Sequence, residues 1–367
     1  MKLTMARGEM LEALSIANKG LSSRSTLPIL AGILVTALED GTISFQATDL
    51  EISVKHDVAG LVDQPGVTVL PGRLITDIVR SLSESAVSIT VESDTASVVC
   101  GQASFTVKTL NPEDFPKFPE VAPDQTITIP TVVFSDLVGH VARAVSRDET
   151  RPILTGVLLV VDGPSIRMVA TDSYRLAVKE TILETPAGDP GEVVIPAKAL
   201  EEAGKLAGSQ ETISIGVAEN QVIFLFEKTT FITRRIDGAF PNYKQLVPKE
   251  HTTNVTLSTE EFASAVKRVS LMAQHNSPVK LTVSTEDQNL ALSASSQDVG
   301  DASEDLMAKV DGPDVEIAFN HAYLSEGISV IKGDVITIST TGSMKPGVIT
   351  AQGDEGFLYL LMPVRLG

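Results

Sequence analysis

Two kinds of hydrophobic periodicity alternate along the chain. Alternating apolar and polar residues, as in 43–47 (ISFQA) and 290–294 (LALSA), are typical of strands with one buried face. Other segments carry apolar residues at helical spacing, such as the stripe of Phe134, Leu137, Val138, Val141 and Val145. Helices are expected at 8–20, 72–83, 134–147, 197–207, 259–273 and 320–332. Many strands with only six helices predict an α+β fold, in which the helices pack on antiparallel sheets.

The predicted elements recur about every 125 residues. RSTLPILAGILV with a following ATDLEISV corresponds to DETRPILTGVLLV with ATDSYRLAV, and Asp49 and Asp172 lie 123 residues apart. Pro71 and Pro196, like Phe115 and Phe240, lie 125 apart. A third, more diverged copy begins near residue 251. Chance similarity among β-rich segments is the alternative, but these landmarks keep one register. The repeat predicts three domains, at 1–124, 125–250 and 251–367.

Composition places the chain among globular proteins, with 43% hydrophobic and 21% charged residues. No apolar run reaches the roughly 20 residues that a membrane span needs, and MKLTMARGEM lacks the pattern of a secretory signal. The single cysteine, Cys100, lies in an alternating strand pattern and is expected to be a small buried apolar residue. These features together predict a cytoplasmic protein.

No constellation of residues indicates catalysis, a metal or a cofactor. The five histidines are scattered, and the chain has no Gly-rich phosphate loop. Asp49 and Asp172 could form a carboxylate pair, but an aspartate that bonds backbone amides in a strand turn is the favoured interpretation. Cys100 has no basic neighbour that would activate a thiol. A non-enzyme without cofactor is therefore expected.

Four motifs, RSTLPIL, VATDSYRLAV, DGAFPNYKQLVP and the terminal YLLMPVRL, resemble the β subunit of bacterial DNA polymerase III, the sliding clamp family. The resemblance covers the whole chain. It implies a head-to-tail homodimer in which six similar domains close a ring around double-stranded DNA, with sheets outside and helices lining the hole. The implied partners are the DNA polymerase III α subunit, the clamp loader and other proteins that carry clamp-binding peptides.

The resemblance also implies site residues. A hydrophobic peptide pocket between the second and third domains would have as its floor Leu154, Thr171, Leu176, Leu246, Met344, Pro346 and Met362. Its rim would comprise Ser173, Tyr174, Arg175 and Pro241, with Pro363, Val364, Arg365 and Leu366 from the C-terminal tail. Candidate DNA contacts come instead from cations of the predicted helices and of the repeated Arg-x-x-Leu-Pro and Arg-Pro loops: Arg24, Arg73, Arg80, Arg143, Arg147, Arg151, Lys198, Lys205 and Lys267. The dimer interface is expected at Phe105, Leu271 and Met272.

Charge is distributed unevenly between the predicted helices and the remaining chain. The formal net charge is −18, which argues against a protein that binds DNA by gripping phosphates. The six predicted helices hold 10 of the 29 basic and 9 of the 47 acidic residues, so the acidity lies elsewhere. Cations at helix C-termini also complement the helix dipole, which explains part of this pattern. A weakly positive lining inside an acidic ring suits sliding.

Two other function classes predict features that the sequence lacks. A repeated adhesive scaffold that does not bind DNA would have a secretion signal and an even charge distribution. The sequence has no such signal, and its charge differs between the predicted helices and the remaining chain. An enzyme built on repeated domains requires a polar constellation that is unique to one copy, and none is visible. The sequence therefore favours a non-catalytic clamp that encloses DNA.

Overall fold

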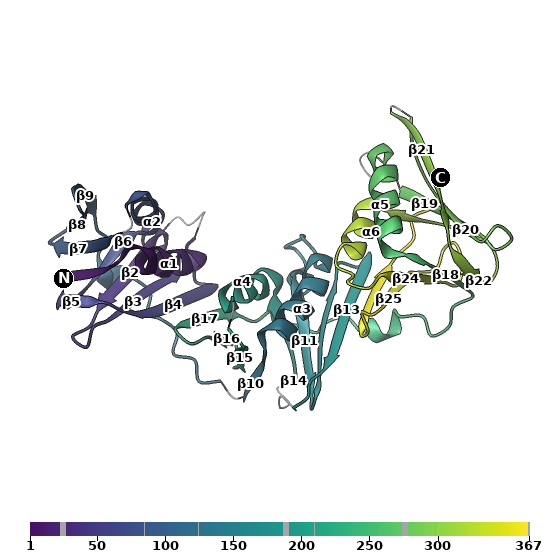
Figure 1. Ribbon diagram of the computed structural model, residues 1–367. Coiled ribbons are helices and arrows are strands. Elements are labelled where there is room, and N and C mark those ends of the chain that lie inside the picture. The colour runs from purple at the N-terminus through teal and green to yellow at the C-terminus, as the bar shows by residue number, and fades with distance from the viewer. Residues whose placement is uncertain are drawn as a thin grey trace. The chain divides into compact units, whose positions relative to one another are not determined.

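The computed structural model describes residues 1–22, 27–83, 85–123, 125–185, 191–208, 210–273, 278–297 and 299–365. Within these ranges the chain forms six α-helices and 26 strands, all of the strand pairs antiparallel, which confirms the α+β fold class (Figure 1). The chain divides into two compact units, Met1–Thr131 with Glu202–Arg235, and Val132–Glu201 with Ile236–Gly367.

Each repeat runs strand, helix, a group of strands, a second helix and three more strands. The first comprises β1 (Lys2–Ala6), α1 (Arg7–Ala17), β2 (Gly32–Ala37), β3 (Thr42–Thr48), β4 (Ile52–Ala59), β5 (Leu61–Gln64), β6 (Gly66–Pro71), α2 (Gly72–Ser81), β7 (Ala86–Glu92), β8 (Thr95–Cys100) and β9 (Ala103–Lys108). The second comprises β10 (Gln125–Pro130), α3 (Thr131–Val141), β11 (Gly156–Asp162), β12 (Ser165–Thr171), β13 (Arg175–Ile182), β14 (Gly191–Pro196), α4 (Ala197–Ala207), β15 (Thr212–Val217), β16 (Gln221–Leu225) and β17 (Thr229–Arg234). The third comprises β18 (Thr253–Ser258), α5 (Thr259–Val269), β19 (Pro278–Ser284), β20 (Asn289–Ser296), β21 (Gly300–Met307), β22 (Lys309–Asp311), β23 (Val315–Asn320), α6 (His321–Ile328), β24 (Val335–Thr340), β25 (Gly347–Gln352) and β26 (Phe357–Leu361).

The six predicted helices are all present; α4 has the predicted bounds, whereas one or both ends of the other five differ from the prediction. α3 begins at Thr131 rather than 134, because its first turn precedes the apolar stripe that defined the prediction. α1, α3 and α5 each end in a short 3₁₀ turn, at Asn18–Gly20, Ala142–Ala144 and Ser270–Met272. The hydroxyl of Ser258 accepts a bond from the Glu261 amide at 3.4 Å and caps α5. Several basic residues counted as helical, including Arg147 and Lys332, therefore lie just beyond α-helix ends.

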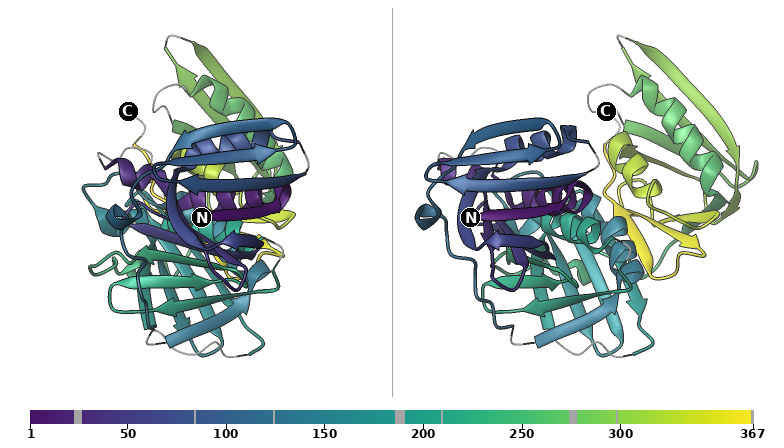
Figure 2. Two further views of the ribbon diagram at one scale, coloured as in Figure 1. Left: turned by 90° about the vertical axis from the view of Figure 1, so that its left-hand side faces the viewer. Right: turned by 60° about the vertical axis from the view of Figure 1, so that its left-hand side comes forward.

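Alternating burial organises the strands as the sequence predicts. Along β20, Leu290, Leu292 and Ala294 are buried while the residues between them are half-buried. In the first unit, α1 and α2 and the strands of two sheets share one apolar core, to which Cys100 contributes as a buried residue. In the second unit, α5 packs beside the β20–β21 hairpin and against α6 (Figure 2).

Two sheets continue across the boundaries between repeats. The order β10-β15-β16-β17-β4-β3-β2-β6 joins strands of the second repeat to strands of the first. The order β14-β11-β12-β13-β26-β25-β24-β18-β22 joins the remaining strands of the second repeat to strands of the third. The second repeat is therefore shared between the two compact units, since each half of its strands is hydrogen-bonded to a different neighbour.

The shared Ala-Thr-Asp motif forms the same turn twice. Asp49 Oδ1 accepts bonds from the amides of Glu51 and Ile52, at 3.0 and 2.7 Å. Asp172 Oδ1 accepts equivalent bonds from Tyr174 and Arg175, at 2.9 and 3.0 Å. The residue after each aspartate has a positive φ, 76° at Leu50 and 81° at Ser173. The interpretation of these aspartates as local turn residues is thus confirmed.

Candidate partner-docking site

The seam between β13 and β26 brings together side chains that are distant in sequence. Arg175 pairs with Leu361 and Leu176 with Leu360 across this seam. Beyond it, the Met362 amide donates to the Tyr174 carbonyl at 2.9 Å. Tyr174, Leu176 and Met362, three residues of the predicted pocket, are therefore neighbours along one strand pair.

The predicted floor residues divide into a buried set and an exposed set. Leu154, Thr171 and Leu176 are buried, and Leu176 belongs to an apolar cluster with Val169, Tyr243, Val348 and Leu360. Leu246, Met344 and Met362 are instead 48%, 52% and 43% exposed, so they stand at the surface rather than beneath it. Tyr174, predicted at the rim, is 59% exposed. Exposed apolar side chains above a buried apolar base are typical of a binding surface.

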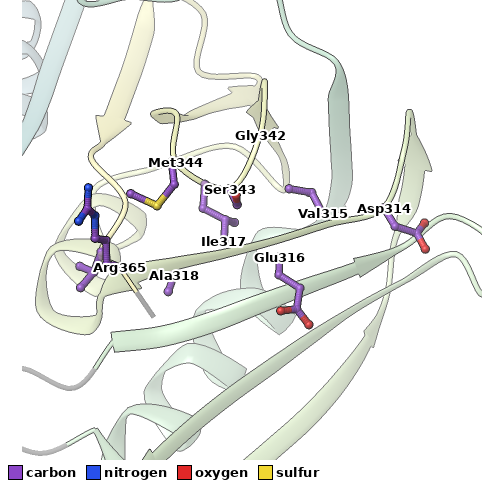
Figure 3. A pocket seen from close by; sticks show the side chains of 10 residues that line it. Asp314, Val315, Glu316, Ile317, Ala318, Gly342, Ser343, Met344 and Arg365 are labelled. Atoms are coloured by element: carbon purple, nitrogen blue, oxygen red, sulfur yellow. The ribbon is translucent and has the colours of Figure 1, made fainter. Parts of the chain in front are cut away.

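The C-terminal tail lines a cavity of about 710 Å³ with the turn before β25 and with strand β23. Three predicted residues, Met344, Val364 and Arg365, contribute to it; Met344 and Arg365 lie at one end and Asp314 at the other (Figure 3). The Val364 amide donates to the Ala318 carbonyl at 2.8 Å and anchors the tail to β23. The rim residues Ser173 and Pro241 are exposed and Pro363 is half-buried, and none of the three lines this cavity. The predicted floor residue Pro346 is half-buried and is not part of the cavity either, and Leu366 lies outside the described residues.

Arg175, predicted on the rim, has a buried side chain. The guanidinium donates to Asp172 Oδ2 at 3.1 Å, to Glu326, and to the carbonyl of Arg143 at 2.6 Å. It also lies 4.4 Å from the centre of the Tyr323 ring. Burial alone would lower the pKa of Arg175, but the Tyr359 hydroxyl and the Glu326 carboxylate outweigh it and the pKa is raised. Arg175 therefore links β13 to α6 at the residue that follows Tyr174.

A second charged network joins α3 to the loop before β26. His140 Nε2 lies 2.9 Å from Asp354 Oδ2, and Lys179 donates to the other oxygen of Asp354. His140, Lys179 and Asp354 are all buried. Burial would raise the pKa of Asp354, but bonds from Lys179, the Lys332 amide and His140 hold that pKa below its ordinary value.

These partners of Arg175 and Lys179 were not predicted from the sequence. Glu326 and Tyr359 lie far from Arg175 along the chain, and Asp354 is equally far from Lys179. The available signal was a pair of cations, Arg175 and Lys179, that flank the apolar Leu-Ala-Val stretch of strand β13. A cation buried in such a strand requires a counterion, but the sequence does not name it.

Three of the predicted DNA contacts share a cavity in the second unit. Arg143 and Arg147, beyond α3, and Lys198, in α4, line a space of about 490 Å³ together with Glu201 and Glu326. The other described DNA-contact candidates are exposed, and three of them are paired: Arg80 with Asp77 at 2.6 Å, Arg151 with Asp148 at 3.2 Å, and Lys205 with Glu202 at 2.8 Å. Arg73 and Lys267 are also exposed, whereas Arg24 lies outside the described residues.

The predicted interface residues lie at or beside sheet edges. Phe105 is on β9, the last strand of its sheet, and is 36% exposed. Leu271 is 73% exposed and Met272 half-buried, in a 3₁₀ turn that contacts β20 and β21. Met307, on the edge strand β21, is 76% exposed and was not predicted. Across the described ranges there is no cluster of His, Cys, Asp and Glu that could hold a metal ion, and no helix there could span a membrane.

Comparison with known proteins agrees with this layout along the entire chain. Three family models match it: the DNA polymerase III beta subunit N-terminal domain over residues 1–119, the central domain over 128–242 and the C-terminal domain over 244–365. Curated proteins called "Beta sliding clamp" from Streptomyces coelicolor and Bacillus subtilis are 37% and 34% identical, each over 378 residues and all of both chains. The solved sliding clamp of Bacillus subtilis superposes with a TM-score of 0.95 at 33% identity, and that of Pseudomonas aeruginosa bound to griselimycin with 0.94 at 26%, both covering each chain fully.

Replacing Arg175 with Met should strongly destabilise the second unit. The substitution leaves Asp172 buried and Glu326 half-buried without their cation, which costs about 3 kcal/mol or more for a buried pair. Thermal unfolding measures the effect. Arg234→Met is the matched control, because Arg234 and Glu51 are 3.5 Å apart and largely exposed, a pair that contributes about 0–1 kcal/mol. Equal melting temperatures for the two variants would contradict the role assigned to Arg175.

The contribution of Asp354 to stability should depend on pH. Its pKa is lower in the folded chain than the ordinary value of about 4, so its stabilisation is present above that value and is lost as the pH falls through the folded pKa. The melting temperature of Asp354→Asn should therefore lie below that of the parent at pH 7, and the gap should narrow towards pH 3. Asp63→Asn, which removes an exposed partner of Lys2, should show a small gap throughout. A gap for Asp354→Asn that is constant with pH would refute this assignment.

Proposed function

Because this chain belongs to the beta sliding clamps, the beta subunits of bacterial DNA polymerase III, we propose that two copies join head to tail into a ring that encloses duplex DNA. The chain is a non-catalytic processivity factor that tethers the polymerase to its template. The domain boundaries 1–124, 125–250 and 251–367 are proposed with it. Each of these segments contains one complete round of the repeated elements.

The observation that supports the ring concerns the two strand pairs that join neighbouring repeats within the chain: both pair equivalent strands. At the first, Phe231 of β17 pairs with Val54 of β4. At the second, Tyr359 of β26 pairs with Ala177 of β13. Val54 and Ala177 occupy one repeat position, since each pairs with the alanine of the Ala-Thr-Asp motif, Ala47 or Ala170. One strand-to-strand joint is thus used twice in one register.

The chain also carries the two strands of a third joint of this kind, but among the described residues these two strands lie in different sheets and do not pair with each other. The strand equivalent to β17 and β26 is β9, and the strand equivalent to β4 and β13 is β21; both are sheet edges. Phe105 corresponds to Phe231, because Phe105 pairs with Val98 as Phe231 pairs with Phe224. Ala302 corresponds to Ala177, because it pairs with Ala294 as Ala177 pairs with Ala170. We therefore expect Phe105 to lie opposite Ala302 of a second copy.

This joint supports a closed dimer rather than a filament. Head-to-tail contacts form a closed ring when the rotation from one subunit to the next adds up to a full turn. Two copies with three repeats each would use the same joint six times. Leu271, Met272, Phe105 and Met307 lie on or beside the free edges, where exposed apolar side chains favour pairing. Enclosure also explains how an acidic chain holds a polyanion, because retention then depends on topology and little on phosphate contacts.

The DNA-facing and partner-facing surfaces are assigned as part of the proposal. The described cations Arg73, Arg80, Arg143, Arg147, Arg151, Lys198, Lys205 and Lys267, with Arg24, would face the duplex. Support comes from Arg143, Arg147 and Lys198, which line one cavity. The pocket around Leu176, Tyr174 and Met362 would take clamp-binding peptides from the polymerase α subunit, the clamp loader and other proteins. The structure of the Pseudomonas aeruginosa clamp bound to griselimycin is consistent with a binding pocket on such a protein.

Cysteine cross-linking tests the ring and its register together. A Phe105→Cys, Ala302→Cys double variant should form covalent dimers on oxidation, and Phe105→Cys with Asp305→Cys, three residues out of register, should form few. When the ring is first loaded onto DNA by a clamp loader and then oxidised, the cross-linked ring should remain on closed circles and run off linear DNA. Equal loss from circles and linear DNA would overturn enclosure, and equal cross-linking of both variants would overturn the register.

Replacing Met362 with Asp should abolish docking without affecting the dimer. A carboxylate at this half-exposed position would have to be buried beneath an apolar peptide side chain without a partner. Fluorescence anisotropy of a labelled Gln-x-x-Leu-Phe-type peptide should show a loss of at least about tenfold in affinity, while sedimentation shows an unchanged dimer. Met307→Asp provides the converse control, with a weakened dimer and normal peptide affinity. Unchanged peptide affinity in Met362→Asp would move the pocket elsewhere.

A further inference from the structure

Strand β23 has one edge that its own sheet does not use. It is the terminal strand in the order β21-β20-β19-β23, and its other edge pairs with β19 from Val279↔Phe319 to Val283↔Val315. In an antiparallel pair, alternate residues direct both backbone groups away from the partner strand. The Ala318 carbonyl is directed outward, because it accepts the bond from Val364 in the C-terminal tail. Glu316, two residues earlier, therefore also presents its amide and carbonyl outward.

The described part of the tail, as far as Arg365, bonds to this edge at Ala318, near the C-terminal end of β23. Beyond Val364 and Arg365, the cavity continues along β23 past Ile317 and Val315 to Asp314 (Figure 3). The cavity is thus a groove with an unpaired strand edge along one side and the turn that carries Met344 along the other. Unpaired edges of this kind accept an extended peptide as an additional strand.

The far half of the groove is acidic. Glu316 is exposed, and its carboxylate forms a solvent-accessible pair with Lys280 at 3.4 Å, which is worth little in water. Asp314 is held in place by the Thr285 amide at 2.8 Å. No cation lines this half of the cavity among the described residues, since Arg365 lies at the end nearer the tail. A peptide that continues from Met344 towards Asp314 would therefore meet two carboxylates.

We propose that this groove is an extension of the docking site, where a cationic, extended segment that flanks a partner's pocket-binding motif adds to β23 as a strand. The inference rests on the proposed docking function, because the groove shares Met344, Val364 and Arg365 with the predicted pocket. The strand edge supplies backbone bonds that are independent of sequence, and Glu316 and Asp314 supply the preference for Lys or Arg. Charge next to the motif would then rank partners that carry the same motif.

Peptide extensions test the groove on the intact protein. A labelled Gln-x-x-Leu-Phe-type peptide is compared with the same peptide carrying Lys-Val-Lys-Val at its N-terminus or its C-terminus. The Lys extension should tighten binding about fivefold in one of the two orientations, through edge hydrogen bonds and ion pairs. A Glu-Val-Glu-Val extension should give no gain, and N-methylation of the extension backbone should remove the gain from Lys-Val-Lys-Val.

The variant Glu316→Lys separates the groove from the pocket. It should cut the gain from the Lys extension to less than twofold and leave the affinity of the short peptide unchanged. Glu219→Lys makes the same charge change on an exposed turn of the first unit and should keep the full gain. No gain in either orientation, or a gain that persists in Glu316→Lys, would overturn the groove while the docking function stands. Failure of the short peptide to bind would overturn the docking function itself.

Discussion

Antiparallel pairing between strands of neighbouring repeats is the interaction on which the rest of this structure depends. β17 with β4 and β13 with β26 convert what would be four sheet edges into the interior of two larger sheets. Unpaired edges expose backbone donors and acceptors that must otherwise bond to water or to another chain. Pairing them within the chain sets the order of the repeats and creates the seam at which Tyr174, Leu176 and Met362 meet. The same logic leaves β9 and β21 as the edges available to a second copy.

The seam in the second unit is reinforced by charges that are unusual for a sheet interior. Arg175 and Lys179 lie on β13 with their side chains buried, and each is neutralised by acidic residues from the third repeat, Glu326 for one and Asp354 for the other. Buried ion pairs are weak sources of net stability, but breaking one is costly because a charge is left unpaired. Such pairs therefore favour one relative placement of β13, α6 and the loop before β26. A docking surface that spans this seam benefits from that rigidity.

In an acidic protein that works on DNA, retention on the duplex cannot depend mainly on electrostatic attraction to the phosphates. With a net charge of −18, the surface offers little overall pull on a polyanion. In the proposed ring, a small group of cations such as Arg143, Arg147 and Lys198 would keep the lining weakly favourable, because enclosure prevents escape. Weak contacts also permit movement along the duplex. The acidity of the remaining surface, including Glu316 and Asp314, is then free to select cationic segments of protein partners.

The amino-acid sequence by itself determined the local structure and the repetition. Period-2 and helical patterns located the strands and all six helices, and the Ala-Thr-Asp motif identified the paired turns at Asp49 and Asp172, because these features depend on near neighbours. The terminal apolar motif pointed to Met362 and Val364. Helix ends were displaced, since the last turns become 3₁₀ and a helix can begin before its apolar stripe.

Only the tertiary structure decided which residues face solvent at the seam and which charges pair within it. Arg175 reads as a rim residue in the sequence, beside the exposed Tyr174, yet it is buried because Glu326 and Tyr359 approach it from the third repeat. The division of the second repeat between two units and the free edge of β23 likewise arise from pairing between distant strands. Hydrophobic periodicity records burial along one element, whereas the partner of a buried charge or a strand edge is set by which distant segments meet.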